Sequence, residues 1–414
     1  MTNKDTGAAI IVGGGQAGAQ CAISLRQYGW PGDIVMIAAE TSLPYQRPPL
    51  SKTYLAGELA ADRLLLRPQN FYDAQNIRVR LGESVTAIDR GNNTVATSKG
   101  EVLSFAKLFL ATGTRPRKLA VPGADLDGIG YIRGIDDVRS LQPAFQTAKN
   151  LIVVGGGYIG LEVAAVARKR GLNVTVIEAG ERLLGRVTAE VVSDFYAAAH
   201  RAKGVDIRLN TTVAAFEGER KVRSARLSSG EELPCDLAVI GVGVLANDEL
   251  AMQAGIEVEP GVGIPVDPAM CTSDPDIYAI GDCALAWSAF AGRRQRIESV
   301  ANAIEQGRIA AAHAAGATMP TPAVPWFWSD QYDIKLQTAG LLSKGYDRAV
   351  VRGDPAGGRF SVFYLDGPTL VALDAINAAA DFNVAKRIIG VPDIALDPAR
   401  VADLGHDVRK LLPG

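Results

Sequence analysis

Two glycine-rich turns, each between a short apolar run and a helix-like stretch, constrain this chain most strongly. The apolar run 8–12 leads into Gly-Gly-Gly-Gln-Ala-Gly at 13–18, and a helix-like stretch follows. The run 151–154 leads in the same way into Gly-Gly-Gly-Tyr-Ile-Gly at 155–160, and a helix-like stretch again follows. A short, continuous apolar run is typical of a strand buried on both faces. Each pattern therefore predicts a strand, a tight turn and a helix.

The spacing of the glycines predicts what each turn binds. A G-x-G-x-x-G turn after a strand is typical of dinucleotide sites. Gly13 makes the tight turn, Gly15 lets the backbone approach a pyrophosphate, and Gly18 permits close helix–strand packing. The free N–H groups at the helix start would hold the phosphates. The second turn begins at Gly155, about a domain length further on, so we expect two dinucleotides, a flavin and a nicotinamide.

In both patterns an acidic residue follows the second predicted strand, where it can accept hydrogen bonds from a ribose. The run 34–39 ends at Glu40, and the run 173–177 ends at Glu178. Glu178 would hold both hydroxyls of the adenosine ribose and repel a 2′-phosphate, which favours NADH. Arg182 and Arg186 lie nearby and leave NADPH as an alternative.

Composition excludes several other classes of protein. The 414 residues include four scattered cysteines and three scattered histidines, and the formal net charge is −2. No C-x-x-C pair or metal-ligand spacing occurs, so we expect no metal site, and any chemistry must come from a bound cofactor. The balanced charge argues against nucleic-acid binding. No apolar run is long enough to span a bilayer and no signal peptide is visible, which predicts a cytoplasmic protein without a membrane anchor.

Two further segments carry a family resemblance. Residues 108–116 contain Ala-Thr-Gly, and residues 272–282 end in Ile-Gly-Asp. With the two glycine turns, they resemble the flavoprotein reductases related to glutathione reductase. The resemblance implies a fold of class α/β, with FAD on the first turn and NADH on the second. It also implies that Asp282 contacts the flavin ribityl chain.

Other segments indicate the branch of that family. Pro-Tyr-Gln-Arg-Pro-Pro-Leu-Ser-Lys at 44–52 has no cysteine, so the disulfide-using branch is excluded. This segment, residues 156–162 and Trp-Phe-Trp-Ser-Asp-Gln at 326–331 closely resemble the putidaredoxin reductase-like NADH-dependent ferredoxin reductases. The resemblance implies electron transfer from NADH through FAD to a two-iron, acidic ferredoxin that supplies an oxygenase. The alternatives are an NADH-dependent rubredoxin reductase and a redox-sensing interaction flavoprotein resembling apoptosis-inducing factor.

The resemblance also implies residue roles. Lys52 and Glu162 are expected to form an ion pair beside the reactive part of the flavin, and Trp328 to lie on the electron path to the partner. The residues expected to contact FAD are Gly13, Gly15, Ala17, Gly18, Ala39, Glu40, Arg47, Lys52, Val85, Ala111, Thr112, Gly113, Arg133, Gly281, Asp282, Val300 and Trp328. Those expected to contact NADH are Gly155, Gly157, Tyr158, Ile159, Gly160, Glu162, Glu178, Arg186 and Gly243.

Docking of an acidic partner needs a basic surface on a chain of balanced charge. Arg67 and Arg308 match basic docking positions in relatives, and the run 293–296 is either a docking patch or a solvated loop. One departure is Ala246, where relatives usually have proline, and we expect it to affect only a loop. We expect a monomer or a weak dimer.

The expected architecture has three domains. An FAD domain spans 1–115 and 248–325, an NADH domain is inserted at 116–247, and a C-terminal α/β interface domain spans 326–414. Strand patterns at 350–351 and 361–365 and a helix near 379–389 support the last of these.

Overall fold

The computed structural model describes residues 7–411, and the chain divides into two compact units. The first unit contains residues 1–46, 62–115 and 244–325, and the second contains 47–61, 116–243 and 326–414. The second unit contains the expected C-terminal domain and residues 116–243 of the expected NADH domain, whereas 244–247 fall in the first unit. The second unit also contains 47–61, which was assigned to the FAD domain. The division into three domains stays a prediction.

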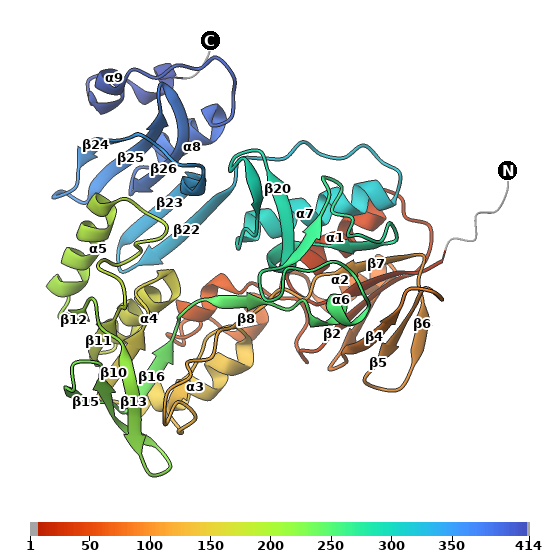
Figure 1. Ribbon diagram of the computed structural model, residues 1–414, viewed down its shortest axis with the longest axis horizontal. Helices are drawn as coiled ribbons and strands as arrows, with labels where there is room; N and C mark the ends of the chain where they lie inside the picture. The colour runs from red at the N-terminus through yellow and green to blue at the C-terminus, as the bar shows by residue number, and fades with distance from the viewer. Residues whose placement is uncertain (1–6, 412–414) are drawn as a thin grey trace. The chain divides into compact units, whose positions relative to one another are not determined.

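The first unit is built on a parallel five-stranded sheet with the order β19-β7-β1-β2-β3. Its central strand is the predicted apolar run, and all four of its residues are buried, as expected for a strand covered on both faces. Helix α1 (Gln16–Gln27) follows β1 and packs beside α7 (Val300–Ala314) (Figure 1). The strands of the sheet are β1 (Ala9–Val12), β2 (Ile34–Ala38), β3 (Ile77–Leu81), β7 (Lys107–Leu110) and β19 (Ile277–Ala279).

Smaller elements complete this unit. An antiparallel sheet contains β4 (Val85–Asp89), β5 (Thr94–Thr97) and β6 (Val102–Ser104), and another sheet contains β18 (Ile264–Val266), β20 (Ala284–Ser288) and β21 (Arg293–Gln295). Strand β8 (Thr114–Pro116) pairs with β17 (Val244–Ala246). The short helices are α2 (Gln69–Ala74), α6 (Glu249–Gln253), η2 (Ala61–Leu64) and η3 (Gly281–Cys283). Ala246 is the last residue of β17 and is buried, so the expectation that it lies in a loop was wrong.

The second unit contains a second parallel five-stranded sheet, with the order β12-β11-β10-β16-β9. Helix α4 (Tyr158–Lys169) follows β10 at the second glycine turn, as predicted. The strands are β9 (Ile129–Gly130), β10 (Asn150–Val154), β11 (Asn173–Ile177), β12 (Val205–Arg208) and β16 (Leu237–Ile240). The other elements of this part are α3 (Ile135–Thr147), α5 (Glu190–Ala202), the 3-10 helix η1 (Pro48–Ser51), and an antiparallel sheet of β13 (Val213–Gly218), β14 (Val222–Leu227) and β15 (Glu232–Pro234).

The C-terminal residues of the second unit form an antiparallel sheet with the order β22-β23-β26-β25-β24. The predicted strand patterns lie within β24 and β25, and the predicted helix is α8 (Ala379–Ile388), which packs against β23 and β26. The α/β class is therefore confirmed, although this last sheet is antiparallel. Its elements are β22 (Trp326–Gln331), β23 (Ile334–Gly340), β24 (Arg348–Asp354), β25 (Arg359–Asp366), β26 (Thr369–Ile376), η4 (Leu342–Lys344), α9 (Pro398–Ala402) and η5 (Val408–Leu411).

Between residues 7 and 411, no helix is both long and apolar enough to cross a membrane.

Candidate cofactor-binding and active site

The first glycine turn leaves its helix N-terminus open. Gly13 has a φ of +124°, and a Cβ there would lie 2.2 Å from the carbonyl oxygen of Ala111, so only glycine fits. Gly15 is the N-cap of α1, yet a Cβ on it would meet no atom within 4 Å. Among residues 7–411 no side chain caps α1, and the first turn of the helix has no acidic residue. The N–H groups at this end are therefore available to an anion such as a pyrophosphate.

Other expected FAD positions surround this turn at the carboxyl edge of the sheet. A Cβ on Gly281 would lie 2.8 Å from the Cβ of Ala17, so the Gly281–Asp282 segment approaches the start of α1 closely. The N–H of Gly281 donates to Oε1 of Gln306 on α7 at 2.7 Å. Four segments that are far apart in the sequence thus meet at one edge, which is where ligands bind in parallel α/β sheets. The expected FAD positions on these segments are Gly13, Gly15, Ala17, Gly18, Ala111, Thr112, Gly113, Gly281, Asp282 and Val300.

The acidic residue of this turn has a side-chain partner. Oε2 of Glu40 accepts a hydrogen bond of 2.5 Å from the Tyr45 hydroxyl, which holds the half-buried carboxylate just beyond the end of β2. Ala39 is exposed beside it, and Val85 is half-buried at the start of β4. The open helix end, the close backbone approach and the fixed carboxylate together fit the pyrophosphate and ribose of FAD.

The second glycine turn has the same backbone geometry. Gly155 has a φ of +108°, and a Cβ on it would lie 2.4 Å from the carbonyl oxygen of Gly241. A Cβ on Gly160 would lie 2.2 Å from the carbonyl oxygen of Gly155, whereas one on Gly157 would meet nothing within 4 Å. Ile159, in the first turn of α4, is 42% exposed, an apolar surface that a bound nucleotide could cover. These features fit a second dinucleotide.

The acidic residue of the second turn bonds to the turn itself. Oε2 of Glu178 accepts from the N–H of Gly156 at 2.6 Å, and Oε1 accepts from the N–H of Gly180 at 2.7 Å. The Arg182 guanidinium is held by the protein, since it donates to the carbonyl oxygens of Thr188 and Gly185 and to the Ser193 hydroxyl. Arg186 is exposed. The Arg182 guanidinium is therefore occupied by hydrogen bonds to the protein and is not directed toward a 2′-phosphate.

Gly243, another expected NADH position, directly precedes β17, and its carbonyl oxygen accepts from the N–H of Arg117 at 2.9 Å.

A buried carboxylate lies on α4, one turn beyond its N-terminus. Glu162 is 1% exposed and accepts from three donors: Lys52 Nζ at 2.8 Å and Ser51 Oγ at 2.5 Å, both to Oε2, and Ser329 Oγ at 2.6 Å to Oε1. Lys52 directly follows η1, and its Nζ also donates to the carbonyl oxygen of Pro48 at 3.2 Å. A buried ion pair is costly to break, because the remaining charge stays in a poorly solvated site. The chain therefore fixes a lysine ammonium at a defined point in the second unit.

Aromatic side chains follow on β22. Trp326 and Trp328 point to the same side of the strand, with ring centroids 5.5 Å apart, and Trp328 is half-buried. Phe327 packs on Tyr158 at the N-terminus of α4, with ring centroids 4.7 Å apart. Strand β22 is thereby fixed against the helix that carries Glu162.

Two expected FAD contacts, Arg47 and Arg133, also lie in the second unit. Nη1 of Arg47 donates to the carbonyl oxygen of Arg133 at 2.7 Å. Oδ2 of Asp137 accepts from the N–H groups of Arg133 and Gly134, at 2.8 and 2.7 Å, and so caps α3. The structure thus brings these two arginines together.

The expected docking residues are exposed on the first unit. Arg67 and Arg308 both face solvent, and the Arg67 guanidinium lies over the Phe71 ring at 5.4 Å. In the run 293–296, Arg293 and Arg294 are exposed on β21, whereas Arg296 pairs with Oε1 of Glu298 at 3.1 Å. Only the first two of these arginines thus present a freely exposed guanidinium.

Sequence reasoning missed three polar residues that hold the acidic side chains: Tyr45, Ser51 and Ser329. Only Ser329 had a weak signal in the sequence. Residues two apart on a strand share a face, so Ser329 is expected to lie on the same face as Gln331 and on the face opposite Trp328. Tyr45 and Ser51 carry no such signal.

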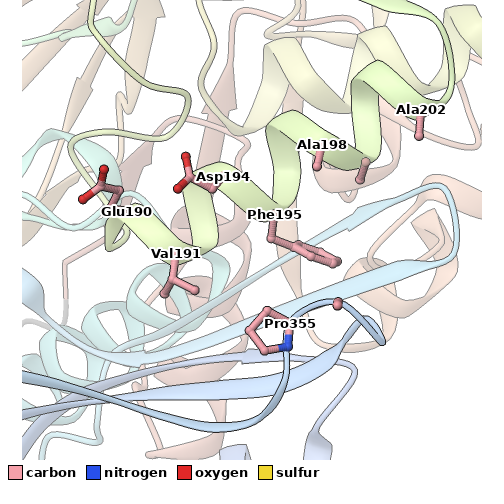
Figure 2. Close-up of a pocket in the computed structure, with 9 residues that line it drawn as sticks. Glu190, Val191, Asp194, Phe195, Ala198, Ala202 and Pro355 are labelled. Atoms are coloured by element: carbon pink, nitrogen blue, oxygen red, sulfur yellow. The ribbon is translucent and has the colours of Figure 1, made fainter.

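A groove lies elsewhere in the second unit. It has a volume of about 700 Å³ and is lined mainly by the apolar side of α5 and by the turn between β24 and β25. Figure 2 shows Phe195 facing Pro355, while the carboxylates of Glu190 and Asp194 point away from it. None of the expected site residues lines this groove.

Residues 7–411 contain no disulfide and no cluster of potential metal ligands. Cys21, Cys235, Cys271 and Cys283 are buried and unpaired, and burial raises the pKa of Cys235 to about 12, so this thiol stays protonated at neutral pH. Within 7–411 there is no group of three or more His, Cys, Asp or Glu side chains that could hold a metal ion.

Comparison with known proteins identifies the family. Residues 7–307 match the pyridine nucleotide-disulphide oxidoreductase family, and residues 326–412 match the reductase C-terminal family. The chain is 45% identical to the 5,5'-dehydrodivanillate O-demethylase ferredoxin reductase subunit of a Sphingobium species, over 97% of each chain. It is also 45% identical to putidaredoxin reductase of Pseudomonas putida, covering 97% of this chain and 96% of that one.

Among solved structures, the covalent putidaredoxin reductase–putidaredoxin complex matches with a TM-score of 0.94 and 43% identity, over 98% of each chain. The first of the two family matches spans both glycine turns. The chain belongs to the pyridine nucleotide-disulphide oxidoreductase family and, within it, to the putidaredoxin reductase-like ferredoxin reductases, which contain FAD and depend on NAD(H).

Proposed function

We propose that this protein passes electrons from NADH, through FAD, to a two-iron ferredoxin that supplies an oxygenase. The observation that carries the proposal is the pair of open glycine turns, one in each unit, in a chain that also holds the buried Lys52–Glu162 ion pair. Two dinucleotide sites suit a transfer between two cofactors, and the cysteines within 7–411 are all unpaired and buried, so no thiol pair is available there to accept electrons. Bound FAD would supply the conversion of a two-electron donor into single-electron transfers.

The residues of the chain have distinct roles in this proposal. The first turn binds the FAD pyrophosphate, while Glu40 binds its ribose; Asp282 contacts the ribityl chain. The second turn binds NADH, and Glu178 disfavours a 2′-phosphate because two negative charges would meet there. Lys52 stabilises negative charge on the reduced cofactor, and Glu162 holds the Lys52 ammonium in place and helps to orient the nicotinamide.

Docking follows from charge and from an aromatic contact. Arg67 and Arg308 would attract an acidic ferredoxin, since complementary charges speed association. Trp328 would lie at the contact and on the electron path, as aromatic side chains are enriched at interfaces. We further propose that the protein works in the cytoplasm as a monomer or weak dimer, which cell fractionation and sedimentation would test.

The test is a coupled assay with NADH and cytochrome c, run with and without a two-iron ferredoxin. We expect cytochrome c reduction to depend on the ferredoxin and to weaken with added salt, because screening reduces docking between opposite charges. Full-rate reduction without any ferredoxin would contradict a carrier-specific reductase. Equal or faster turnover with a rubredoxin would favour the rubredoxin reductase alternative.

A further inference from the structure

The carboxylate of Glu162 ends a chain of buried polar side chains that its proposed role leaves unexplained. Ser329 and Gln331 are two residues apart on β22, so both point to the side opposite Trp328. His200 comes from α5 and is also fully buried. Buried polar groups are costly unless they are bonded, so a chain of them needs a physical reason.

The four side chains are connected by hydrogen bonds. Ser329 Oγ lies 2.6 Å from Oε1 of Glu162, and Nε2 of Gln331 lies 3.2 Å from Ser329 Oγ. Oε1 of Gln331 lies 2.9 Å from Nε2 of His200. The Tyr332 hydroxyl lies 3.2 Å from Nδ1 of the same ring and closes the chain on the far side.

The direction of these hydrogen bonds follows from the chemistry of the end group. An ionised carboxylate only accepts hydrogen bonds, so the Ser329 hydroxyl must donate its single proton to Glu162. Ser329 Oγ then accepts from the Gln331 amide, which leaves the amide oxygen facing His200. Because that oxygen only accepts, the ring must carry its proton on Nε2, and Nδ1 accepts from Tyr332. Burial lowers the pKa of His200, which favours this neutral ring.

We propose that Ser329, Gln331 and His200 are positioning residues that hold the Glu162 carboxylate for hydride transfer. In this row of hydrogen-bonded side chains, each bond is donated in the direction of Oε1 of Glu162. Oε2 accepts from Lys52 and Ser51 instead. A carboxylate held at both oxygens cannot turn away from the lysine ammonium. The inference rests on the proposed function, because it gives the chain its purpose in the reduction of FAD by NADH.

The kinetic test compares two serines of the same antiparallel sheet. Ser361 on β25 is also fully buried and donates to a carboxylate, Oδ2 of Asp381 at 2.8 Å, but not to Glu162. Stopped-flow reduction of the enzyme-bound FAD by NADH gives the limiting rate and the Kd for NADH separately. We expect Ser329→Ala to lower the limiting rate about tenfold with a nearly unchanged Kd, because it removes one hydrogen bond to a charged group. Ser329→Thr keeps the hydroxyl and should retain most of the rate, and Ser361→Ala should leave it unchanged.

A limiting rate for Ser329→Ala equal to that of Ser361→Ala would overturn the inference, provided that the wild-type FAD is reduced by NADH. If NADH failed to reduce the FAD bound to the wild-type protein, the proposed function would be overturned instead.

A spectroscopic test requires no variant. The sequence has only three histidines, so nitrogen-15 labelling of histidine gives a spectrum that can be assigned. We expect His200 to be neutral and protonated at Nε2 at neutral pH. A ring protonated at Nδ1, or at both nitrogens, would overturn the direction of the chain and with it the inference.

Discussion

The two glycine turns have the same backbone geometry but differ in the groups that bond to their acidic residues. In both, a Cβ on the first glycine would meet a backbone carbonyl oxygen, at 2.2 Å for Gly13 and 2.4 Å for Gly155, and the third position of each is open. Glu178 accepts from backbone N–H groups of its own turn, whereas Glu40 accepts from the Tyr45 side chain. The turn is thus dictated by sterics, and the ribose end of each site by side chains that differ.

Two buried acids, Glu83 in the first unit and Asp374 in the second, differ as well. Burial on its own would raise the pKa of Glu83 in the first unit, but hydrogen bonds from Thr97 and Arg80 and the charges of Arg80 and Lys99 lower it. Burial raises the pKa of Asp374 in the second unit to about 7, because its one opposing interaction is a hydrogen bond from Tyr364. The contributions of these two carboxylates to stability should therefore depend on pH in opposite directions.

The largest expected effect concerns Asp374. Its pKa is higher in the folded state than in the unfolded chain, so its stabilising contribution is complete at low pH and is lost as the pH rises through about 7. Between about pH 4 and about pH 8, we expect the free energy of unfolding to fall by up to about 4 kcal/mol more in the wild type than in Asp374→Asn. Urea unfolding across this range measures the difference.

The matched variant is Glu83→Gln in the first unit. The folded-state pKa of Glu83 is lowered, so its contribution is present above the unfolded pKa and is lost as the pH falls. We expect this variant to lose stability near neutral pH but little below the unfolded pKa. Parallel pH profiles for both variants and the wild type would contradict the opposite pH dependence of Glu83 and Asp374.

The second largest expected effect is a loss of cofactor affinity that distinguishes the two glycine turns. Gly15→Ala and Gly157→Ala add a methyl group that meets no protein atom within 4 Å, so the fold should tolerate both. The methyl would occupy space that a pyrophosphate needs, and we expect affinity to fall about tenfold to a hundredfold for FAD in the first variant and for NADH in the second. Flavin content per chain and the Kd for NADH measure the two losses. Loss of both cofactors in both variants would mean that the turns do not bind separately.

The smallest effect concerns the two acidic residues. Glu178→Gln removes the charge that disfavours a 2′-phosphate, and we expect the preference for NADH over NADPH to drop about tenfold. Glu40→Gln changes the equivalent acid of the first unit and should leave this preference intact. Initial rates with each nucleotide give the ratio, and an unchanged ratio in Glu178→Gln would refute its role.

The sequence predicted what local sterics decide. The turns at Gly13 and Gly155, the strands before them and the acids after them are all where the spacing placed them. Contact between Lys52 and Glu162 was also expected, but from the family resemblance and not from their separation in the chain.

The missed features depend on contacts between distant segments. Ser51 and Ser329 lie far from Glu162 in sequence and reach it only through the fold, as Tyr332 and Gln331 reach His200. The face on which a serine lies does not reveal its partner, because the partner is set by the placement of the elements in the fold rather than by its neighbours in sequence. The antiparallel order of the C-terminal sheet escaped prediction for the same reason.

The most direct test of the central claim is an anaerobic titration of the purified protein with NADH, followed by flavin absorbance. If the first turn binds FAD and the second binds NADH, the protein is yellow, and one equivalent of NADH bleaches the flavin band while the same amount of NADPH reduces it far more slowly. A protein that binds no flavin when supplied with FAD, or whose flavin NADH leaves oxidised, would contradict the account.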